Sequence, residues 1–223
     1  MKVLIHACPQ RMWYVDEFLK PSLEEQGADE VKVWCDTAKR GILNACMDSF
    51  ETRTEGGDTW HIQDDVLICR DFVERCRALD AERGLMYGFC CEPFTDDPQQ
   101  AGRVHLESAW HSFQCVRIPD DWALECAKWY QSGVWRDIVN SELPILHYFG
   151  KGDDTFFRVF MLECHKYEMV RNIAPNLVEH VDWIVGGSTH SQYRDFLARS
   201  DYWDDEALVD ELRDKVKGKV QYF

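Results

Sequence analysis

Two adjacent carboxylates, Asp64 and Asp65, interrupt an apolar stretch of the sequence between Trp60 and Phe72. Ionised carboxylates are rarely buried unless they are paired or hold a metal ion, so this position needs a physical reason. A buried strand that ends at the two acids would place them at the carboxyl edge of a sheet, where open α/β sheets bind their ligands. Carboxylates there suit a hard divalent cation that also binds phosphate oxygens. A solvated surface turn is the alternative that this stretch alone leaves open.

Other acids and one histidine stand in comparable places. Asp36 follows the apolar run 31–35, and an acid after the second strand of a nucleotide-binding α/β fold often hydrogen-bonds a ribose or a base edge. Asp153 and Asp154 precede an apolar helical stretch, and His180 ends a short apolar segment. Carboxylates with one histidine form an oxygen-rich site with a nitrogen ligand, which suits Mn²⁺ or Mg²⁺. Helix capping is the alternative for these acids, and an ordinary surface or core position is the alternative for the histidine.

The elements that position these residues are predicted from hydrophobic periodicity. Residues 2–7 and 31–35 form apolar runs typical of strands, and residues 11–26 have helical spacing. Strand, helix and strand within about 35 residues make a βαβ unit, which implies a parallel sheet. The further predicted elements are helices at 41–50, 70–83, 121–134, 155–168 and 204–216, a helix within 135–146, strands at 60–65, 85–91 and 108–119, and a loop at 94–102.

Length and composition are those of one α/β domain, with or without a helical appendage. The chain has 223 residues, of which 45% are hydrophobic and 13% aromatic, so it can bury a full core. We predict a catalytic domain over residues 1–190 and a helical extension over residues 191–223 that packs on it. The net charge of −15 repels nucleic acid and anionic membranes in general, although a local basic groove is compatible with it.

The cysteines and the apolar runs indicate where the protein resides. The sequence has 10 cysteines but no Cys-x-x-Cys pair, and most of them lie within apolar segments, where a thiol behaves as a small hydrophobe. We therefore expect thiols and a reducing, cytoplasmic setting rather than a disulfide framework. No apolar run reaches the length of about 18 residues that a membrane span needs, and the first residues lack the apolar core of a signal peptide.

The order of these motifs resembles the GT-A-type glycosyltransferases, which use nucleotide sugars, over about residues 1–190. The resemblance implies an α/β, Rossmann-like fold with a mixed, mostly parallel central sheet flanked by helices. It implies that a first strand and its loop, here residues 5–11, contact the nucleotide, and that an acid after the second strand contacts the base or ribose. The residues so implied in donor binding are Arg11, Asp36, Lys39, Arg40, Gln63 and Asp64.

The same resemblance implies a metal centre and a catalytic base. A DXD-type motif after a third strand holds the metal and the diphosphate in this family, and Gln63-Asp64-Asp65 takes that place here. The sequence departs from the pattern because Gln63 replaces the first acid. A later acidic pair at a helix start serves the acceptor hydroxyl, as general base in inverting members, and a downstream histidine completes the metal shell. The residues so implied are Asp65 and His180 for Mn²⁺ or Mg²⁺, and Asp154 and Asp153 for catalysis.

These observations predict a metal-dependent glycosyltransferase that moves a sugar from a nucleotide-diphosphate donor, a UDP-sugar before others, to a hydroxyl acceptor. Inversion of configuration is the expected outcome, and retention is the alternative that the sequence leaves open. A hydroxymethylated base in DNA is one candidate acceptor, because four arginines could form a basic patch, although the net charge of −15 argues against it. A sugar-nucleotide nucleotidyltransferase is an alternative, but the loop 8–11 lacks the glycines that such an enzyme needs. A non-catalytic nucleotide- or sugar-binding protein is another. The four arginines are Arg70, Arg75, Arg77 and Arg83.

Overall fold

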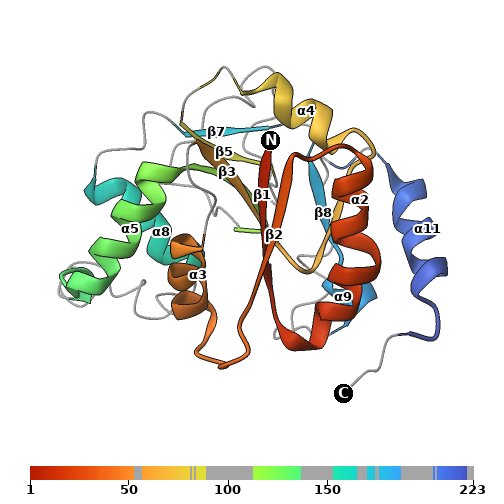
Figure 1. Cartoon of the computed structure of the whole chain (residues 1–223), viewed down its shortest axis with the longest axis horizontal. Coiled ribbons are helices and arrows are strands. Elements are labelled where there is room, and N and C mark those ends of the chain that lie inside the picture. Colours follow the sequence, from red (N-terminus) through yellow and green to blue (C-terminus); the bar gives the residue numbers. More distant parts are fainter. Residues whose placement is uncertain are drawn as a thin grey trace.

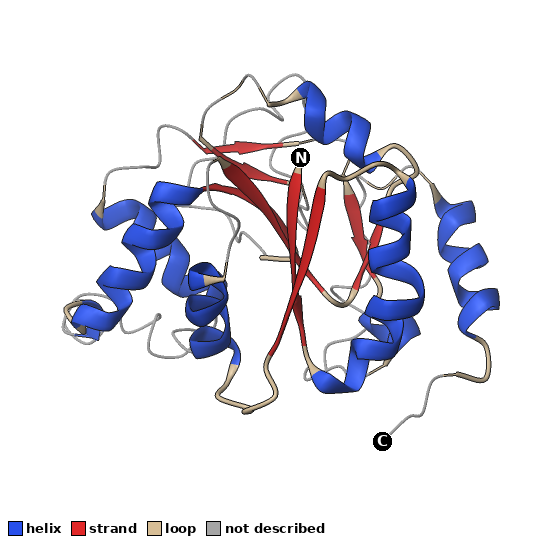
Figure 2. Cartoon of the chain, viewed as in Figure 1, coloured by secondary structure: helices blue, strands red, loops and turns tan. Residues whose placement is uncertain are grey.

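A six-stranded mixed sheet forms the centre of the chain, with helices on both of its faces (Figure 1, Figure 2). The computed structural model describes residues 1–52, 57–80, 82, 84–88, 113–136, 153–164, 170–173, 176–186, 203 and 205–219. The strand order is β2-β1-β3-β6-β5-β7, and β4 and β8 form a separate two-stranded sheet. The strands are β1 (Lys2–Ala7), β2 (Glu30–Cys35), β3 (Asp58–Gln63), β4 (Val66–Ile68), β5 (Leu85–Tyr87), β6 (Cys115–Pro119), β7 (Val170–Asn172) and β8 (Val178–His180).

The pairing of the strands aligns three carboxyl ends at one edge of the sheet. Strand β1 runs parallel to β2 and β3, and β5 runs parallel to β7, whereas β6 is antiparallel to both β3 and β5. In this register Ala7 of β1 lies beside Cys35 of β2, and His6 lies beside Gln63 of β3. The loops that follow β1, β2 and β3 therefore emerge side by side.

Two apolar cores, one on each face of the sheet, explain why β1 is apolar over most of its length. Strands covered on both faces read as continuous hydrophobic runs, as β1 does. One core joins the sheet to α2, α4, α9 and α11, and the other joins it to α3, α5 and α8 (Figure 1). These helices are α2 (Lys20–Glu25), α3 (Ile42–Glu51), α4 (Phe72–Ala78), α5 (Asp120–Ser132), α8 (Asp153–Glu163), α9 (Asp182–Val185) and α11 (Glu206–Val216).

A continuous helical segment connects β1 to β2 and starts at the site edge. It begins with a 3₁₀ turn, η1 (Pro9–Arg11), in which proline occupies a first helical position that its fixed φ favours. It continues through α1 (Met12–Tyr14) and a π-helical stretch, η2 (Val15–Leu19), into α2. The βαβ unit predicted from the sequence is thereby confirmed.

The remaining predicted elements are mostly confirmed, with shifted boundaries. The third strand ends at Gln63 rather than at Asp65, and the helix predicted at 70–83 covers Phe72–Ala78. The strand predicted at 108–119 is β6, which is antiparallel, and the described part of the strand at 85–91 is β5. The terminal helix, α11, packs Val209, Leu212 and Val216 into the core that includes α9. The predicted loop at 94–102 and most of the helix predicted within 135–146 lie outside the described residues.

Two expectations about the chain as a whole can be compared with the structure. None of the helices within the described ranges is long and apolar enough to cross a membrane. The cysteines that the structure describes are thiols rather than disulfides, as predicted. The division at residue 190 stays a prediction, as does the cytoplasmic setting.

Candidate functional site

The acid pair, Asp64 and Asp65, is buried in the turn between β3 and β4. The exposed fractions of these residues are 2% and 7%, so the turn is not a solvated one. Asp64 Oδ2 accepts a hydrogen bond of 2.6 Å from the backbone N–H of Cys8, which follows β1. The Arg11 guanidinium of η1 spans both acids, with Nε 2.7 Å from Asp64 Oδ1 and Nη1 3.2 Å from Asp65 Oδ2. The loop after β1 thus supplies both a donor and a cation to the pair.

The histidine predicted as a ligand reaches the same place from the far end of the chain. Strand β8 pairs antiparallel with β4, so that His180 lies opposite Val66, and Val181 N donates to Asp65 O over 2.7 Å. These backbone contacts bring His180 Nε2 to 3.4 Å from Asp65 Oδ2. The backbone N–H of His180 donates to Glu179 Oε1 at 3.1 Å. Asp65 and His180 therefore meet, although the sequence separates them widely.

Burial and charge act in opposite directions on the two carboxyl groups. Burial raises the pKa of Asp64 to about 6, although Arg11 opposes the rise. Burial also favours the neutral form of Asp65, but Arg11 and His180 outweigh it and hold the pKa of Asp65 below its ordinary value. Burial lowers the pKa of His180, yet the neighbouring Asp65 more than compensates and the net pKa is raised. Near neutral pH the acid pair thus carries negative charge opposite a positive guanidinium.

The geometry of Asp65 and His180 fits a divalent cation with few protein ligands. Within the described residues no group of three or more His, Cys, Asp or Glu side chains could hold a metal ion. Neighbouring ligands of an octahedral ion at about 2.1 Å lie about 3 Å apart, close to the 3.4 Å between His180 Nε2 and Asp65 Oδ2. Asp65 Oδ1 is buried and forms no hydrogen bond in the described part of the chain, so a ligand atom remains. Two protein ligands leave coordination positions for phosphate oxygens and water.

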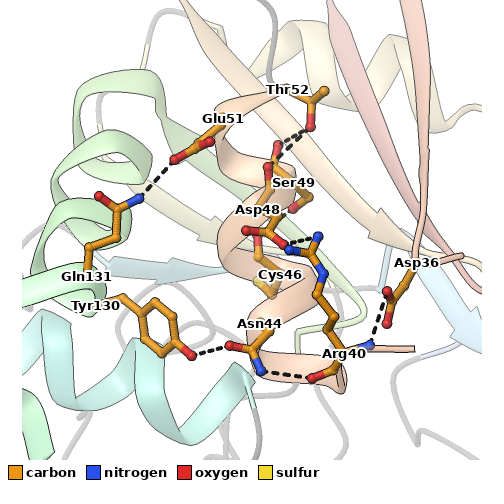
Figure 3. Close-up of polar contacts among 10 residues, drawn as sticks. All are labelled: Asp36, Arg40, Asn44, Cys46, Asp48, Ser49, Glu51, Thr52, Tyr130 and Gln131. Carbon is orange, nitrogen blue, oxygen red and sulfur yellow. Dashed lines mark hydrogen bonds and ion pairs between the residues drawn. The ribbon is translucent and has the colours of Figure 1, made fainter. Parts of the chain in front are cut away.

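The loop after β2 holds three of the residues implied in donor binding. Asp36 N donates to Ala7 O at 2.9 Å, which fixes Asp36 beside the end of β1. Asp36 Oδ1 accepts a hydrogen bond of 3.3 Å from Arg40 N, and the Arg40 guanidinium pairs with Asp48 of α3 (Figure 3). Lys39 is exposed and has a φ of +52°, a left-handed conformation that is uncommon outside glycine. The structure therefore places Asp36 at the shared edge but directs Arg40 onto α3.

Polar contacts between α3 and α5 hold the end of the loop that follows β2. Tyr130 of α5 donates to Asn44 Oδ1, and Asn44 Nδ2 donates to the backbone oxygen of Arg40 at 2.8 Å (Figure 3). Gln131 Nε2 donates to Glu51 Oε1 at 2.9 Å near the other end of α3 (Figure 3). These contacts fix the end of the loop through α3.

The second acidic pair opens a helix, as the sequence predicts. Helix α8 begins at Asp153, and Asp154 follows in its first turn. The side chains of both residues lie outside what the structure describes, so their catalytic role stays a prediction. The helix is anchored on the α3 and α5 face of the sheet by buried aromatic residues. They are Phe156, Phe157 and Phe160.

A histidine pair beneath the same edge was not anticipated from the sequence. His6 Nε2 lies 2.9 Å from His61 Nδ1, and Ser49 Oγ lies 3.2 Å from His6 Nδ1. Burial lowers the pKa of His6 to about 4, which keeps this imidazole neutral near neutral pH. The periodicity of each strand gives the face of its histidine, but the contact follows from the pairing of β1 with β3.

Two further contacts of the site depend on segments that the sequence does not connect. Arg11 was implied in nucleotide contact, and nothing in the sequence indicated that it spans the acid pair. Tyr14, one turn further on, donates from its hydroxyl to Val66 O at 2.8 Å and so fixes the start of β4 beside the acids. The sequence signal that could have indicated the contact of Arg11 with the acids is a basic residue shortly after the first strand.

The arginines considered as a basic patch for DNA are held by neighbouring groups. Arg70 pairs with two acids of the C-terminal segment, and Arg77 pairs with Asp29 at 2.9 Å. Arg75 donates to the backbone oxygen of Asn176 at 3.5 Å, and Arg83 lies outside the described residues. Two of these arginines, Arg70 and Arg77, are therefore paired with acids, which weakens the predicted basic patch.

Comparison with solved structures shows which fold this is. The residue 1–349 fragment of S. aureus TarS superimposes with a TM-score of 0.50 at 12% identity, over 83% of this chain and 62% of that one, so this chain spans less than two thirds of that fragment. An active-site mutant of LgtC superimposes with a TM-score of 0.50 at 14% identity, over 100% and 97% of the two chains. A structure of galactosyltransferase LgtC with donor and acceptor sugar analogs gives 0.49 at 12% identity, over 99% and 100%.

Comparisons of sequence alone give a different result, since neither a protein-family model nor a curated protein matches this chain. The structural likeness nevertheless shows a GT-A-type glycosyltransferase fold, with a mixed, mostly parallel central sheet flanked by helices. The fold predicted from the order of motifs is therefore confirmed.

Proposed function

We propose that this protein is a glycosyltransferase that moves a sugar from a nucleotide-diphosphate donor to a hydroxyl acceptor. The observation that carries the proposal is the buried acid pair at the carboxyl edge of β3, where Asp65 meets His180. Burying two carboxylates lowers the stability of a fold unless other groups compensate their charge, so their retention suggests a function. The carboxyl edge of an α/β sheet is where ligands bind. A GT-A-type fold around this pair favours a nucleotide sugar as the ligand.

The donor would lie across the ends of β1, β2 and β3. Asp36 would contact the ribose or base, and Gln63 and Asp64 would line the diphosphate site, with Lys39 and Arg40 near the phosphates after a change of side-chain rotamer. Asp65 and His180 would hold Mn²⁺ or Mg²⁺. A divalent cation there supplies Lewis-acid stabilisation of the diphosphate leaving group. A UDP-sugar is the first donor to test.

The acceptor hydroxyl would meet one of the acids that open α8. In the proposed inverting reaction Asp154 or Asp153 accepts the proton of the hydroxyl as it attacks the anomeric carbon. We expect Asp154→Ala to lower transfer by about 10²- to 10⁴-fold and to leave donor affinity unchanged. Asp153→Ala removes the adjacent carboxylate of the same helix start, so comparing transfer by the two variants identifies which of the two acids is the base. An equal loss of donor affinity in Asp154→Ala would contradict the assigned role.

The identity of the acceptor is to be found by screening. LgtC is described in complex with an acceptor sugar analog, which makes small saccharides a first class to test. DNA with hydroxymethylated bases is a second class, although its support from the four arginines has weakened, because two of them pair with acids. A screen that includes both classes costs little once the donor is known.

The experiment that tests the proposal is a thermal-shift titration with nucleoside diphosphates and nucleotide sugars, with and without Mn²⁺. A ligand at about 100 times its dissociation constant adds about 2.7 kcal/mol to the free energy of unfolding, which is readily seen. We expect one nucleotide to stabilise the protein in a metal-dependent way and Asp65→Ala to abolish the effect of the metal. Normal metal-dependent donor affinity in that variant would overturn the metal assignment. No response to any nucleotide would favour a non-catalytic protein of this fold.

The nucleotidyltransferase alternative is disfavoured by the loop after β1. A glycine-rich loop cradles phosphates with its backbone N–H groups, whereas Cys8–Arg11 contains no glycine and forms a 3₁₀ turn. The backbone N–H of Cys8 is already used by Asp64. Release of pyrophosphate from a nucleoside triphosphate and a sugar phosphate would nevertheless identify that activity directly.

A further inference from the structure

We propose that Arg11 and the divalent cation compete for Asp65, so that the cation binds together with the nucleotide rather than before it. This inference rests on the proposed function and deepens it. In the arrangement that the structure shows, the Arg11 guanidinium lies where a cation would contact the acid pair. Donor binding would draw one side of the guanidinium off Asp65, and the vacated oxygen would then serve the cation.

The first support is that one carboxylate oxygen serves both partners. Asp65 Oδ2 lies 3.2 Å from Arg11 Nη1 and 3.4 Å from His180 Nε2. A cation held by Asp65 and His180 would occupy the space between this oxygen and the imidazole. The guanidinium cannot keep its contact there, because like charges at such separations repel strongly in a buried site.

The second support is the burial of the acid pair and its charge. Asp64 and Asp65 are almost inaccessible, and Arg11 is the basic side chain that contacts both. Buried carboxylates need a compensating positive charge. Arg11 meets this need in the absence of a metal ion, and a divalent cation would make part of that compensation redundant.

The third support is the hydrogen-bonding capacity of Arg11. An arginine has five N–H donors, and Arg11 directs its Nε toward Asp64 and its Nη1 toward Asp65. The side chain remains 13% exposed, so it is not sealed in the core. Guanidinium groups bind phosphate oxygens in a two-pronged manner. Arg11 can therefore keep Nε on Asp64 and offer its outer nitrogens to a diphosphate by rotating its side chain.

The test is the affinity for Mn²⁺ alone, measured by electron paramagnetic resonance of the hexaaqua ion, and then in the presence of UDP and other nucleoside diphosphates. The proteins are the full chain, Arg11→Gln and Arg11→Lys. The matched control is Arg70→Gln, because Arg70 also contacts two carboxylates but lies on the surface. Lysine keeps the charge and contacts fewer oxygens, so Arg11→Lys remains informative if Arg11→Gln does not fold.

We expect Arg11→Gln to bind Mn²⁺ alone about tenfold more tightly than the unmodified chain, with Arg11→Lys between them and Arg70→Gln unchanged. We also expect the nucleotide to raise Mn²⁺ affinity in the unmodified chain and much less in Arg11→Gln, because the competition that couples the two ligands is gone.

The outcomes separate this inference from the proposed function. Metal-dependent nucleotide binding by the unmodified chain, with no gain of Mn²⁺ affinity in either Arg11 variant, overturns the competition and leaves the glycosyltransferase proposal standing. Weaker Mn²⁺ binding in both variants shows that Arg11 supports the cation and also overturns it. Absence of Mn²⁺ and nucleotide binding in every protein overturns both.

Discussion

Two arginines in this molecule each contact two carboxylates, and burial distinguishes them. The distances are 2.7 and 3.2 Å for Arg11 and 2.9 and 2.7 Å for Arg70, so the pairs are alike in geometry. The exposed fraction of the side chain is 13% for Arg11 and 55% for Arg70. The acids are Asp64 and Asp65 for Arg11, and Asp205 and Glu211 for Arg70.

The difference teaches that solvent exposure, and not the distances between the charged atoms, decides how strongly an arginine and its two acids depend on one another. Around Arg70 water screens the charges, and the contacts help to fasten α11 to the segment between β4 and α4. Around Arg11 the acids are cut off from water, so each charge depends on its partner. In the competition proposed above, a ligand that brings its own charge would displace Arg11 from its acids, whereas the solvent-screened contacts of Arg70 offer no such coupling.

The largest expected effect comes from removing Arg11, the cation of the buried acid pair. We expect Arg11→Ala to lower the free energy of unfolding by about 3–5 kcal/mol, because it leaves adjacent buried carboxylates without their cation. Urea unfolding monitored by tryptophan fluorescence measures this quantity. Arg70→Ala is the control, for which we expect a much smaller loss. Equal losses in the two variants would remove the distinction drawn between the two arginines.

A half-buried histidine, His6, gives a second, smaller effect. Burial lowers the pKa of His6 to about 4, and its described partners, Ser49 and His61, are not acids. The unfolded chain takes up the proton near pH 6.5, whereas the folded protein resists it, so stability falls as the pH drops through this interval. Between about pH 7 and about pH 4.5 we expect the unmodified chain to lose about 2 kcal/mol more than His6→Asn.

Urea unfolding of both proteins at each pH measures that difference, and the contribution of Asp64 cancels because both proteins contain it. Parallel pH profiles for the two proteins would mean that His6 is protonated as easily in the folded state as in the unfolded one. Parallel profiles would also contradict the inference that burial, without a neighbouring charge, keeps the His6 imidazole neutral.

The smallest expected effect is the salt dependence of the destabilisation caused by Arg11→Ala and by Arg70→Ala. Raising the ionic strength from about 0.05 to about 0.5 M shortens the screening length to a few ångströms. We expect the destabilisation by Arg70→Ala to vanish at the higher salt concentration, while that by Arg11→Ala changes by less than about 0.5 kcal/mol. Unfolding titrations at both salt concentrations provide the measurement. A matching decrease for Arg11→Ala would show that its acids are reached by solvent ions.

The sequence by itself determined the local elements and the character of the site edge. The apolar runs of β1 and β2 and the helical spacing between them identified the βαβ unit, because these patterns report which face of an element is buried. The acids after β2 and β3 were placed at the carboxyl edge for the same reason. Two adjacent acids between apolar segments indicate a site at the sheet edge even when no tertiary contact is known.

The tertiary structure alone decided which of these groups meet. His180 reaches Asp65 because β8 pairs with β4, and Arg11 reaches both acids because the loop after β1 folds back over the end of β3. The acids that pair with Arg70 are Asp205, the N-cap of α11, and Glu211 within α11, so Arg70 adds no unpaired charge to the predicted basic patch. Periodicity indicates the buried face and the length of an element. The pairing of distant strands and charges depends instead on the free energy of contacts between segments, and neither segment's sequence indicates which partner it contacts.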